Sequence, residues 1–222
     1  LFRSLCISDH FYPTDLRDTL VEGLTLLPGV ELKARNAHFL TVGVTENLEY
    51  VAHGLPAGIK PYEDVERGGD YPEIAALARS RGGLTIASHP HWREENYWSL
   101  AALAAIPDLT GLEIYNGHLI FRNSGRPLAT DLWDALLTLG RVLWGYANDD
   151  FHRWGDLGRA WNMVLAPSAS PHDLLASLAR GSFYATTGAE FQRIAVEGDT
   201  LVLTLTMPGV LQNYSGQTLA LP

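Results

Sequence analysis

Histidine and carboxylate side chains follow several short apolar segments of this chain, and they are the side chains best able to bind a metal ion. The apolar run at residues 5–8 leads into Asp9 and His10, and the run at residues 84–88 leads into His89. In α/β sheets and barrels, function gathers at the carboxyl ends of strands, so we expect these residues to lie together. Mixed imidazole and carboxylate ligands suit zinc, manganese or iron. The predicted metal ligands are His10, Glu31, His38, His89, Asp150 and His152.

A single histidine after a strand is more often an ordinary loop residue than a ligand. Several such residues at strand ends are not independent, and together they favour a metal site. His91 and His118 also follow strand ends, and we interpret them as candidate substrate contacts. His53 lies in an irregular loop and His172 at a helix start, so both are expected to be solvated.

The elements that must position these residues alternate between strand and helix from residue 72 to residue 181, a pattern typical of a parallel α/β architecture. Helices are predicted at 72–81, 99–106, 128–139 and 171–180, and strands at 84–88, 112–115 and 141–147. Upstream, short strands are expected at 5–8, 26–31 and 38–44, with Pro28-Gly29 in a turn and Glu31 at the end of its strand. Residues 51–69 are expected to form a loop. Residues 194–206 resemble two strands joined by a turn at 197–199, which suggests a small β-rich extension over 191–222 beside a domain over 1–190.

The bulk composition excludes some classes of protein. The 222 residues fit one domain with a short appendage, and the net charge of −9 without a basic stripe argues against long contacts with a nucleic-acid backbone. A bound metal would still allow a small phosphorylated substrate. No apolar run reaches the roughly 18 residues of a membrane span, and no signal peptide is visible. The single cysteine, Cys6, excludes an internal disulfide and fits a reducing, cytoplasmic compartment. Oligomeric state leaves no sign in the sequence.

Six short motifs occur in a fixed order over residues 5–188. They are Ile-Ser-Asp-His at 7–10, Leu-Pro-Gly-Val-Glu at 27–31, His-Phe-Leu at 38–40, Ile-Ala-Ser-His-Pro at 86–90, Asp-Phe-His at 150–152 and Gly-Ser-Phe-Tyr-Ala-Thr at 181–186. This series resembles the T-D-H, P-G-x-E, H-x-L, A-H-P, D-x-H and G-x-F-Y-A-T elements of the PHP domain (polymerase and histidinol phosphatase) family.

The resemblance implies a distorted (β/α)7 barrel that holds two or three divalent ions, usually zinc, manganese or iron, and hydrolyses phosphate esters. It implies that Glu31 bridges two ions, that His38 and His89 complete one of those sites, and that Asp150 binds the other. His10 and His152 would hold the third ion. Asp9 would orient neighbouring ligands, and Asp149, where the family more usually has a serine, would support ligands rather than bind metal.

One departure from the family is the missing H-x-H motif of the first strand, together with the histidine that follows it. The chain opens almost directly on the second motif, at Asp9 and His10. Because a barrel without its first strand would leave an unpaired edge, we expect that strand to belong to a segment outside this sequence. If the protein has instead lost the motif, the corresponding metal would bind weakly or not at all.

The sequence therefore predicts a metal-dependent phosphoesterase that attacks a small phosphate mono- or diester with a metal-activated water. Arg122 and Arg153 follow strand ends and are the predicted phosphate-binding groups. Two alternatives stay open. An amidohydrolase-like enzyme would cleave C–N or carboxylic ester bonds, although its pattern relies on a lone late aspartate, whereas Asp150 here pairs with His152. A degenerate barrel would bind a ligand without turnover, although such a barrel has no physical reason to retain costly polar ligands.

Overall fold

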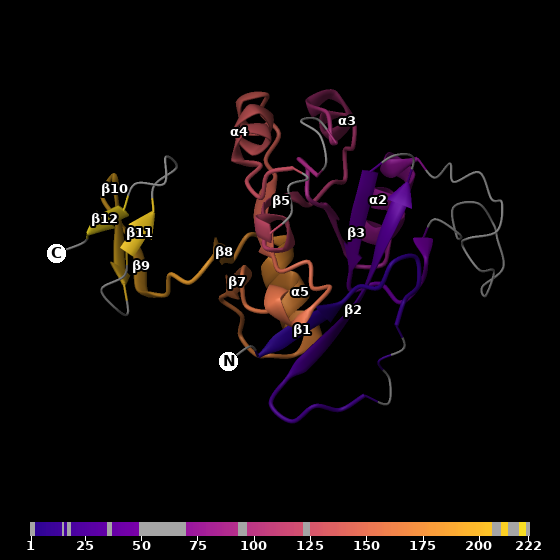
Figure 1. Ribbon diagram of the computed structural model, residues 1–222, viewed down its shortest axis with the longest axis horizontal. Coiled ribbons are helices and arrows are strands. Elements are labelled where there is room, and N and C mark those ends of the chain that lie inside the picture. Colours follow the sequence, from indigo (N-terminus) through magenta and orange to yellow (C-terminus); the bar gives the residue numbers. More distant parts are fainter. Residues whose placement is uncertain are drawn as a thin grey trace.

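The central element of the computed structural model is a curled six-stranded sheet with helices packed against it (Figure 1). The structure describes residues 3–14, 16, 19–34, 37–48, 70–92, 97–121, 125–205, 210–212 and 218–220. The strand order follows the chain order, β1-β2-β3-β4-β5-β6. These strands are β1 (Ser4–Ile7), β2 (Thr25–Ala34), β3 (Ala37–Val42), β4 (Leu84–Ala87), β5 (Gly111–Asn116) and β6 (Trp144–Asn148).

The sheet is mixed rather than wholly parallel. β1 pairs with β2 in parallel, β3 is antiparallel to both β2 and β4, and β4, β5 and β6 run parallel. Only two residues separate β2 from β3, and a parallel crossover needs a dozen or more, so the chain must reverse there. β7 (Trp161–Val164) and β8 (Phe183–Thr186) form a separate antiparallel pair. The α/β class is confirmed, but the described residues form a half-barrel and not a closed seven-stranded barrel.

β2 differs from the prediction in its length. The strand continues through Pro28 and Gly29, where a turn was expected, so Glu31 lies inside the strand and not at its end. Pro28 has no N–H to offer, but its carbonyl accepts a hydrogen bond from the Gly43 N–H at 2.7 Å. A Cβ at Gly29 would lie 2.7 Å from the Cys6 Sγ, so only glycine fits against β1. Pro28 and Gly29 are therefore part of a β-strand here and not of a turn.

Within the described residues, α2 (Tyr71–Ser80), α3 (Leu100–Ala104), α4 (Thr130–Thr138) and α5 (Pro171–Ala179) each confirm a predicted helical segment. Ser99 and Ser170 cap the N-termini of α3 and α5, each accepting a backbone hydrogen bond on its side chain. Two short 3-10 helices, η1 (His118–Phe121) and η2 (Trp154–Asp156), lie in the connections after β5 and β6. Among the described residues, no helix is long and apolar enough to cross a membrane.

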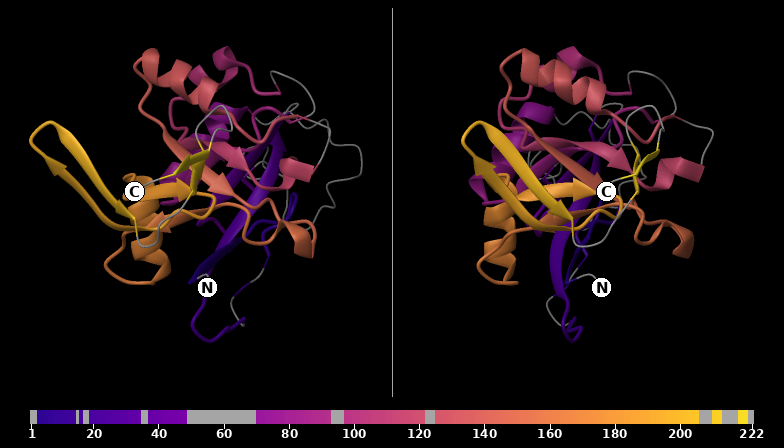
Figure 2. Two further views of the ribbon diagram at one scale, coloured as in Figure 1. Left: turned by 60° about the vertical axis from the view of Figure 1, so that its left-hand side comes forward. Right: turned by 90° about the vertical axis from the view of Figure 1, so that its left-hand side faces the viewer.

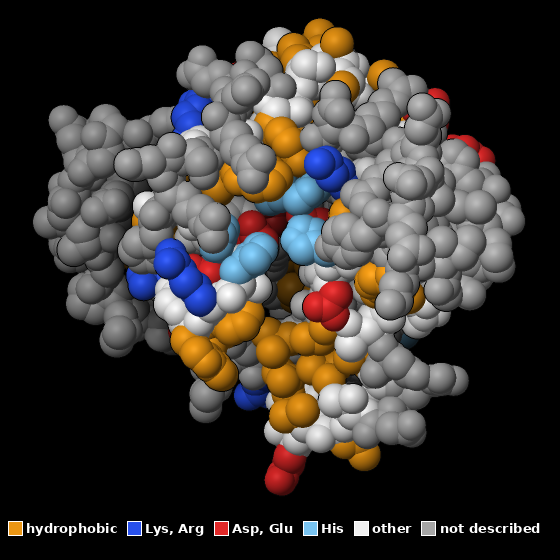
Figure 3. Space-filling view, turned by 45° about the vertical axis from the view of Figure 1, so that its right-hand side comes forward, with side chains coloured by type: hydrophobic (Ala, Val, Ile, Leu, Met, Phe, Trp, Pro, Cys, Tyr) orange, Lys and Arg blue, Asp and Glu red, His pale blue; other side chains and the backbone are white. Residues whose placement is uncertain are grey.

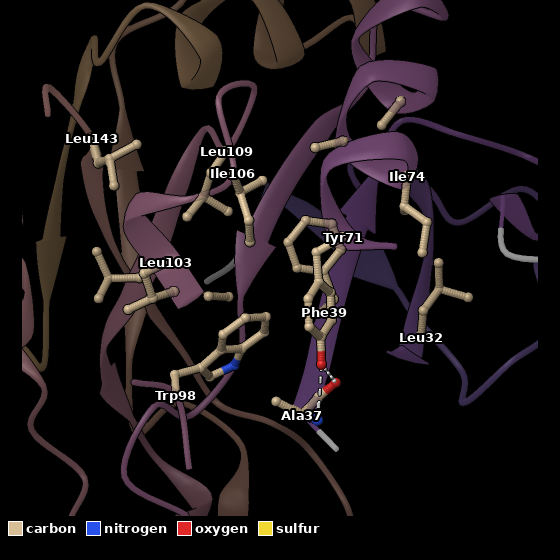
Figure 4. Close-up of a cluster of buried hydrophobic side chains, with 14 of the residues drawn as sticks. Leu32, Ala37, Phe39, Tyr71, Ile74, Trp98, Leu103, Ile106, Leu109 and Leu143 are labelled. Atoms are coloured by element: carbon tan, nitrogen blue, oxygen red, sulfur yellow. Dashed lines mark hydrogen bonds between the residues drawn. The ribbon is translucent and has the colours of Figure 1, made fainter. Parts of the chain in front are cut away.

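The main hydrophobic core connects the sheet to α2, α3 and α4 (Figure 4). Phe39, Tyr71 and Trp98 are buried there with their rings in contact. The Tyr71 hydroxyl donates to the Ala37 carbonyl at 3.2 Å and accepts from the Ala37 N–H at 3.0 Å. The Trp98 indole N–H donates to the His38 carbonyl at 3.1 Å. The core thus fixes the backbone of Ala37 and His38 at the start of β3.

The C-terminal part of the chain forms hairpins outside the sheet. β9 (Phe191–Glu197) pairs antiparallel with β10 (Thr200–Leu205) through the predicted turn, and β11 (Val210–Gln212) pairs with β12 (Thr218–Ala220). The β9–β10 hairpin projects away from the rest of the molecule (Figure 2). The strands predicted at 194–206 are confirmed, and the domain boundary at residue 190 stays a prediction. Residues 51–69, with His53, lie outside the described residues.

Candidate metal centre

A cavity of about 680 Å³ opens on the concave side of the sheet, and polar side chains gather at its rim. Histidine side chains surround the hollow, with acidic side chains beside them (Figure 3). Residues from β1, β2, β3, β4, β5, β6 and β7 line the cavity, so distant parts of the sequence meet in one place. The predicted site residues along its wall are Asp9, His10, Glu31, Asp150 and His152.

Three atoms of buried side chains form a nearly equilateral triangle beside this cavity. The Glu31 Oε1 lies 3.1 Å from the His38 Nδ1 and 3.1 Å from the His89 Nε2. The two ring nitrogens are 3.2 Å apart. Glu31 comes from the middle of β2, His38 from the start of β3 and His89 from the turn after β4.

This triangle fits a divalent ion. Around a tetrahedral ion with bonds of about 2.0–2.1 Å, neighbouring ligand atoms lie roughly 3.3–3.4 Å apart. The three separations of 3.1 to 3.2 Å approach that spacing. Two imidazole nitrogens that face one carboxylate oxygen and also each other suit a shared cation better than a chain of hydrogen bonds. Glu31, His38 and His89 are therefore chemically fit to hold a metal.

The electrostatics of the triangle favour an ionised Glu31. Burial raises the pKa of Glu31, but hydrogen bonds from His38 and His89 outweigh burial and hold that pKa below its usual range. Burial lowers the pKa of His38 despite the carboxylate beside it. Burial also acts to lower the pKa of His89, yet its hydrogen bond to Glu31 leaves that pKa raised overall. Glu31 therefore stays ionised at neutral pH.

The other three predicted ligands lie around this triangle. The His10 Nδ1 is 3.3 Å from the Glu31 Oε2, the second oxygen of the same carboxylate. The His10 ring centroid is 5.1 Å from that of His38 and 6.0 Å from that of His152. The His152 Nδ1 lies 2.9 Å from the Asp150 carbonyl oxygen. The structure thus brings the six predicted ligands to one rim.

Backbone strain also concentrates at this rim. Within the described residues, three residues other than glycine have positive φ, namely Phe11 at 66°, His89 at 28° and Asp150 at 50°. Two of them are predicted ligands, and Phe11 follows a third. L-residues adopt this region rarely, and such strain persists where the surrounding structure enforces it, often at functional sites.

Glu113 is a buried carboxylate that the sequence prediction missed. Its Oε2 accepts hydrogen bonds from the His89 N–H at 2.6 Å and the Asn116 Nδ2 at 3.0 Å, and its Oε1 accepts one from the Asn148 Nδ2 at 2.7 Å. Asn116 also donates to the Asp150 Oδ2 at 3.1 Å. Glu113 therefore ties together the turns that carry His89 and Asp150. The available signal was a glutamate inside an otherwise apolar strand.

Burial raises the pKa of Glu113 to about 7, and the negative charge of Asp150 adds to that rise. The positive charge of His89 and the two asparagine hydrogen bonds oppose it. A carboxyl group with a pKa raised toward neutral pH, beside two predicted ligands, makes this part of the structure a candidate functional site.

Asp9 and Arg153 occupy the edge of the site. The exposed Asp9 carboxylate accepts a hydrogen bond from the Thr14 hydroxyl, while the Asp9 carbonyl accepts one from the Glu31 N–H at 3.1 Å. The half-exposed Arg153 side chain places its Nε 3.3 Å from the Asp156 Oδ1. Their predicted roles in orienting ligands and binding phosphate stay predictions, and Arg122 lies outside the described residues.

His91 and His118, the two candidate substrate contacts, are both buried. The His91 Nε2 lies 2.9 Å from the Asp131 Oδ1 and 2.9 Å from an Arg126 nitrogen, so this ring is turned toward α4. The His118 Nδ1 lies 2.9 Å from the Asp156 Oδ2, and the His118 ring centroid is 4.4 Å from that of His152. His118 therefore borders the rim of predicted ligands, and its substrate contact stays a prediction.

Asp149 organises a loop next to the site. Its two carboxylate oxygens accept hydrogen bonds from the backbone N–H groups of Gly158, Arg159 and Ala160, at 2.6 to 2.8 Å. The role of Asp149 in supporting ligands stays a prediction.

Comparisons with known proteins show which solved structures have a similar fold. The chain matches no model of a protein family and no curated protein sequence. Among solved structures, it is similar to a two-domain protein from Bacteroides vulgatus that contains a predicted PHP-like metal-dependent phosphoesterase, with a TM-score of 0.55 and 16% identity over 94% of this chain and 67% of that one. It is also similar to PsfC from Pseudomonas syringae, with a TM-score of 0.51 and 16% identity over 84% of this chain and 77% of that one. The predicted resemblance to PHP-like proteins is confirmed at the level of the fold.

Proposed function

We propose that this protein is a metal-dependent hydrolase whose substrates are small phosphate mono- or diesters. The triangle formed by Glu31, His38 and His89 carries the proposal. His10, Asp150 and His152 surround that triangle and offer ligands for at least one further ion. The similarity to a protein described as a PHP-like metal-dependent phosphoesterase favours phosphate esters over amides.

The proposed ligands would bind different cations. Glu31 would hold cations with both oxygens, because Oε1 faces His38 and His89 while Oε2 faces His10. Asp150 would hold a further cation beside His152. When bound, divalent cations supply positive charge to a phosphoryl group and acidify a water molecule at neutral pH. Zinc, manganese and iron all suit this mixture of nitrogen and oxygen ligands.

The residues of the chain would also orient the substrate. Arg153 stands half-exposed beside His152, and a guanidinium pairs well with phosphate oxygens. Glu113 would keep the turns that carry His89 and Asp150 in fixed positions relative to each other, through its hydrogen bonds to His89 and Asn116. The carboxylates of the site carry several negative charges, which cations must offset before a phosphate can enter.

The test compares the wild-type protein with Glu31→Gln and with His172→Gln as a matched control, because the His172 side chain is 91% exposed on α5, which carries no predicted ligand. Metal content is measured after dialysis against Zn²⁺ or Mn²⁺, and turnover is measured with p-nitrophenyl phosphate, bis-p-nitrophenyl phosphate and an anilide. We expect the wild type and His172→Gln to bind two or more equivalents and to cleave a phosphate ester. Glu31→Gln should lose metal and at least ~100-fold in turnover.

Two results would contradict the proposal. A folded wild-type protein that binds no metal would favour a binding barrel without turnover. Cleavage of the anilide with no cleavage of either phosphate ester would favour amidohydrolase-like chemistry.

A further inference from the structure

We propose that His118, held by the buried carboxylate of Asp156, is an additional metal ligand and shares a divalent ion with His152. The inference deepens the proposed metal-dependent function and rests on it, because His152 belongs to the proposed centre. It assigns to His118 a role other than the substrate contact predicted from the sequence.

The orientation of the His118 ring is the first observation. His118 begins η1 and is 5% exposed, and Asp156, which ends η2, is fully buried. The His118 Nδ1 donates to the Asp156 Oδ2 at 2.9 Å. A proton held on Nδ1 leaves the lone pair on Nε2 free to bind a metal ion. A histidine that donates its other N–H to a carboxylate is the usual arrangement for a metal ligand.

His152 is prepared in the same way. Its Nδ1 donates to the Asp150 carbonyl oxygen at 2.9 Å, so its lone pair also lies on Nε2. Within the part of the chain that the structure describes, neither Nε2 has a hydrogen-bond partner. The two ring centroids are 4.4 Å apart. Two imidazoles with their Nδ1 protons occupied, at this separation, are positioned to bind one ion between them.

Asp156 is better suited to hold His118 than to bind the ion itself. Its ligand atom lies within 4.8 Å of those of His118 and His152, so distance alone would allow direct ligation. However, its Oδ2 already accepts hydrogen bonds from the His118 ring and from the backbone N–H groups of His152 and Arg153. Its Oδ1 faces the Arg153 Nε at 3.3 Å. The Asp156 carboxylate therefore holds the ring of His118 and the backbone of His152.

The His10 ring also lies near His152, with ring centroids 6.0 Å apart. The proposed site is therefore rich in imidazole nitrogen, with His118 and His152 as ligands and His10 as the neighbouring one. Nitrogen ligands of this kind suit zinc more than magnesium or calcium.

Metal counting tests the inference without using turnover. The wild type, His118→Gln, Asp156→Asn and the exposed control His172→Gln are stripped with a chelator, dialysed against graded Zn²⁺ and assayed for bound metal. Circular dichroism establishes that each variant is folded. We expect His118→Gln to lose one equivalent that the wild type and His172→Gln retain. Asp156→Asn should bind the same equivalent ~10–100-fold more weakly.

The outcomes separate the two proposals. If His118→Gln binds as many equivalents as the wild type at unchanged Kd, His118 is not a ligand, while the proposed function stands. If the wild type itself binds no metal, the proposed function fails first. Should His118→Gln not fold, the wild type labelled with ¹⁵N-histidine gives the answer. The Nε2 resonance of His118 must move on addition of Zn²⁺, and a resonance that stays in place overturns the inference.

Discussion

At the scale of the residue, three buried carboxylates hold the site together, and each of them contacts several other groups. Glu31 faces three imidazoles, Glu113 holds two ligand-bearing turns, and Asp156 holds one ring and two backbone N–H groups. Each carboxylate is buried, and each accepts a hydrogen bond from at least one residue that is distant in sequence. Removing one of them leaves buried donors without an acceptor, which costs more than the loss of a surface contact.

Glu113 should make the metal-free protein lose stability as pH rises. Its pKa is raised to about 7 in the folded state, above the value near 4.5 of an unperturbed glutamate, so the folded state binds the proton more tightly. Its stabilising contribution is fully present below pH ~4.5 and is lost as pH rises through ~7. The loss should be on the order of 2–3 kcal/mol.

Urea unfolding with a chelator present, at pH 5 and pH 8, measures this effect. Glu113→Gln should flatten the pH dependence between these two values, whereas the exposed control Glu190→Gln should not. An identical pH dependence in Glu113→Gln and the wild type would show that Glu113 does not titrate in this range.

Arg153→Ala should raise KM for a phosphate ester ~10-fold or more while leaving bound metal unchanged, because the guanidinium would contact the substrate. Arg193→Ala, on the exposed hairpin, is the matched control. Steady-state kinetics and metal analysis of the same samples check the prediction. An unchanged KM would remove Arg153 from the substrate site.

At the scale of the element, α5 packs against the sheet, and its Leu178 lines the cavity. Its Leu174 is buried in a second core cluster with Leu27 and Val42, and its N-terminus is capped by Ser170, which accepts the Asp173 N–H at 3.2 Å. Ser170→Ala should therefore lower the free energy of unfolding by ~1 kcal/mol.

Chemical denaturation of Ser170→Ala beside the exposed control Thr187→Ala checks this value. Metal content should stay the same in both variants, since α5 carries no predicted ligand. A change below ~0.3 kcal/mol in Ser170→Ala would mean that the cap contributes little.

Local signals explain which elements could be predicted. The spacing of Ile74 and Ala78 and the Ser170-Pro171 pair are properties of a few neighbouring residues, and both helices are where they predict. The antiparallel pairing of β3 and the passage of β2 through Pro28 depend on partners distant in sequence. Periodicity carries no information about such partners.

The same distinction holds for the site. Ligand types that follow apolar runs predicted the residues that meet at the rim. Glu113 was missed because its importance depends on Asn116 and Asn148, and nothing in its own segment marks those partners. The proposed pairing of His118 with Asp156 likewise joins residues 38 positions apart.

At the scale of the whole molecule, the β9–β10 hairpin stands apart from the sheet and exposes apolar residues such as Ile194 and Val196 (Figures 1 and 2). It is tied to the body where the Phe191 N–H donates to the Tyr184 hydroxyl at 3.0 Å. A lone two-stranded hairpin contributes little stability of its own.

A chain ending after residue 190 should therefore keep its metal content, and its Tm should fall by no more than ~4 °C. Differential scanning calorimetry and metal analysis test this against the full 222 residues. A larger fall, or loss of metal, would show that the hairpin and the residues after it belong to the same cooperative unit as the sheet.

The positive φ angles of His89 and Asp150 have a consequence for protein engineering. Glycine adopts such angles without a steric penalty, so at these positions a glycine would relax the backbone. A laboratory selection that rewards only heat resistance in metal-free protein would accept glycine at the partly buried Asp150, and would remove a predicted ligand in doing so. It would reject glycine at His89, where loss of the buried ring would leave a cavity and unpair Glu31. Variants recovered from such a selection should be more stable but bind less metal, which makes thermal stability alone a misleading measure of success for this protein.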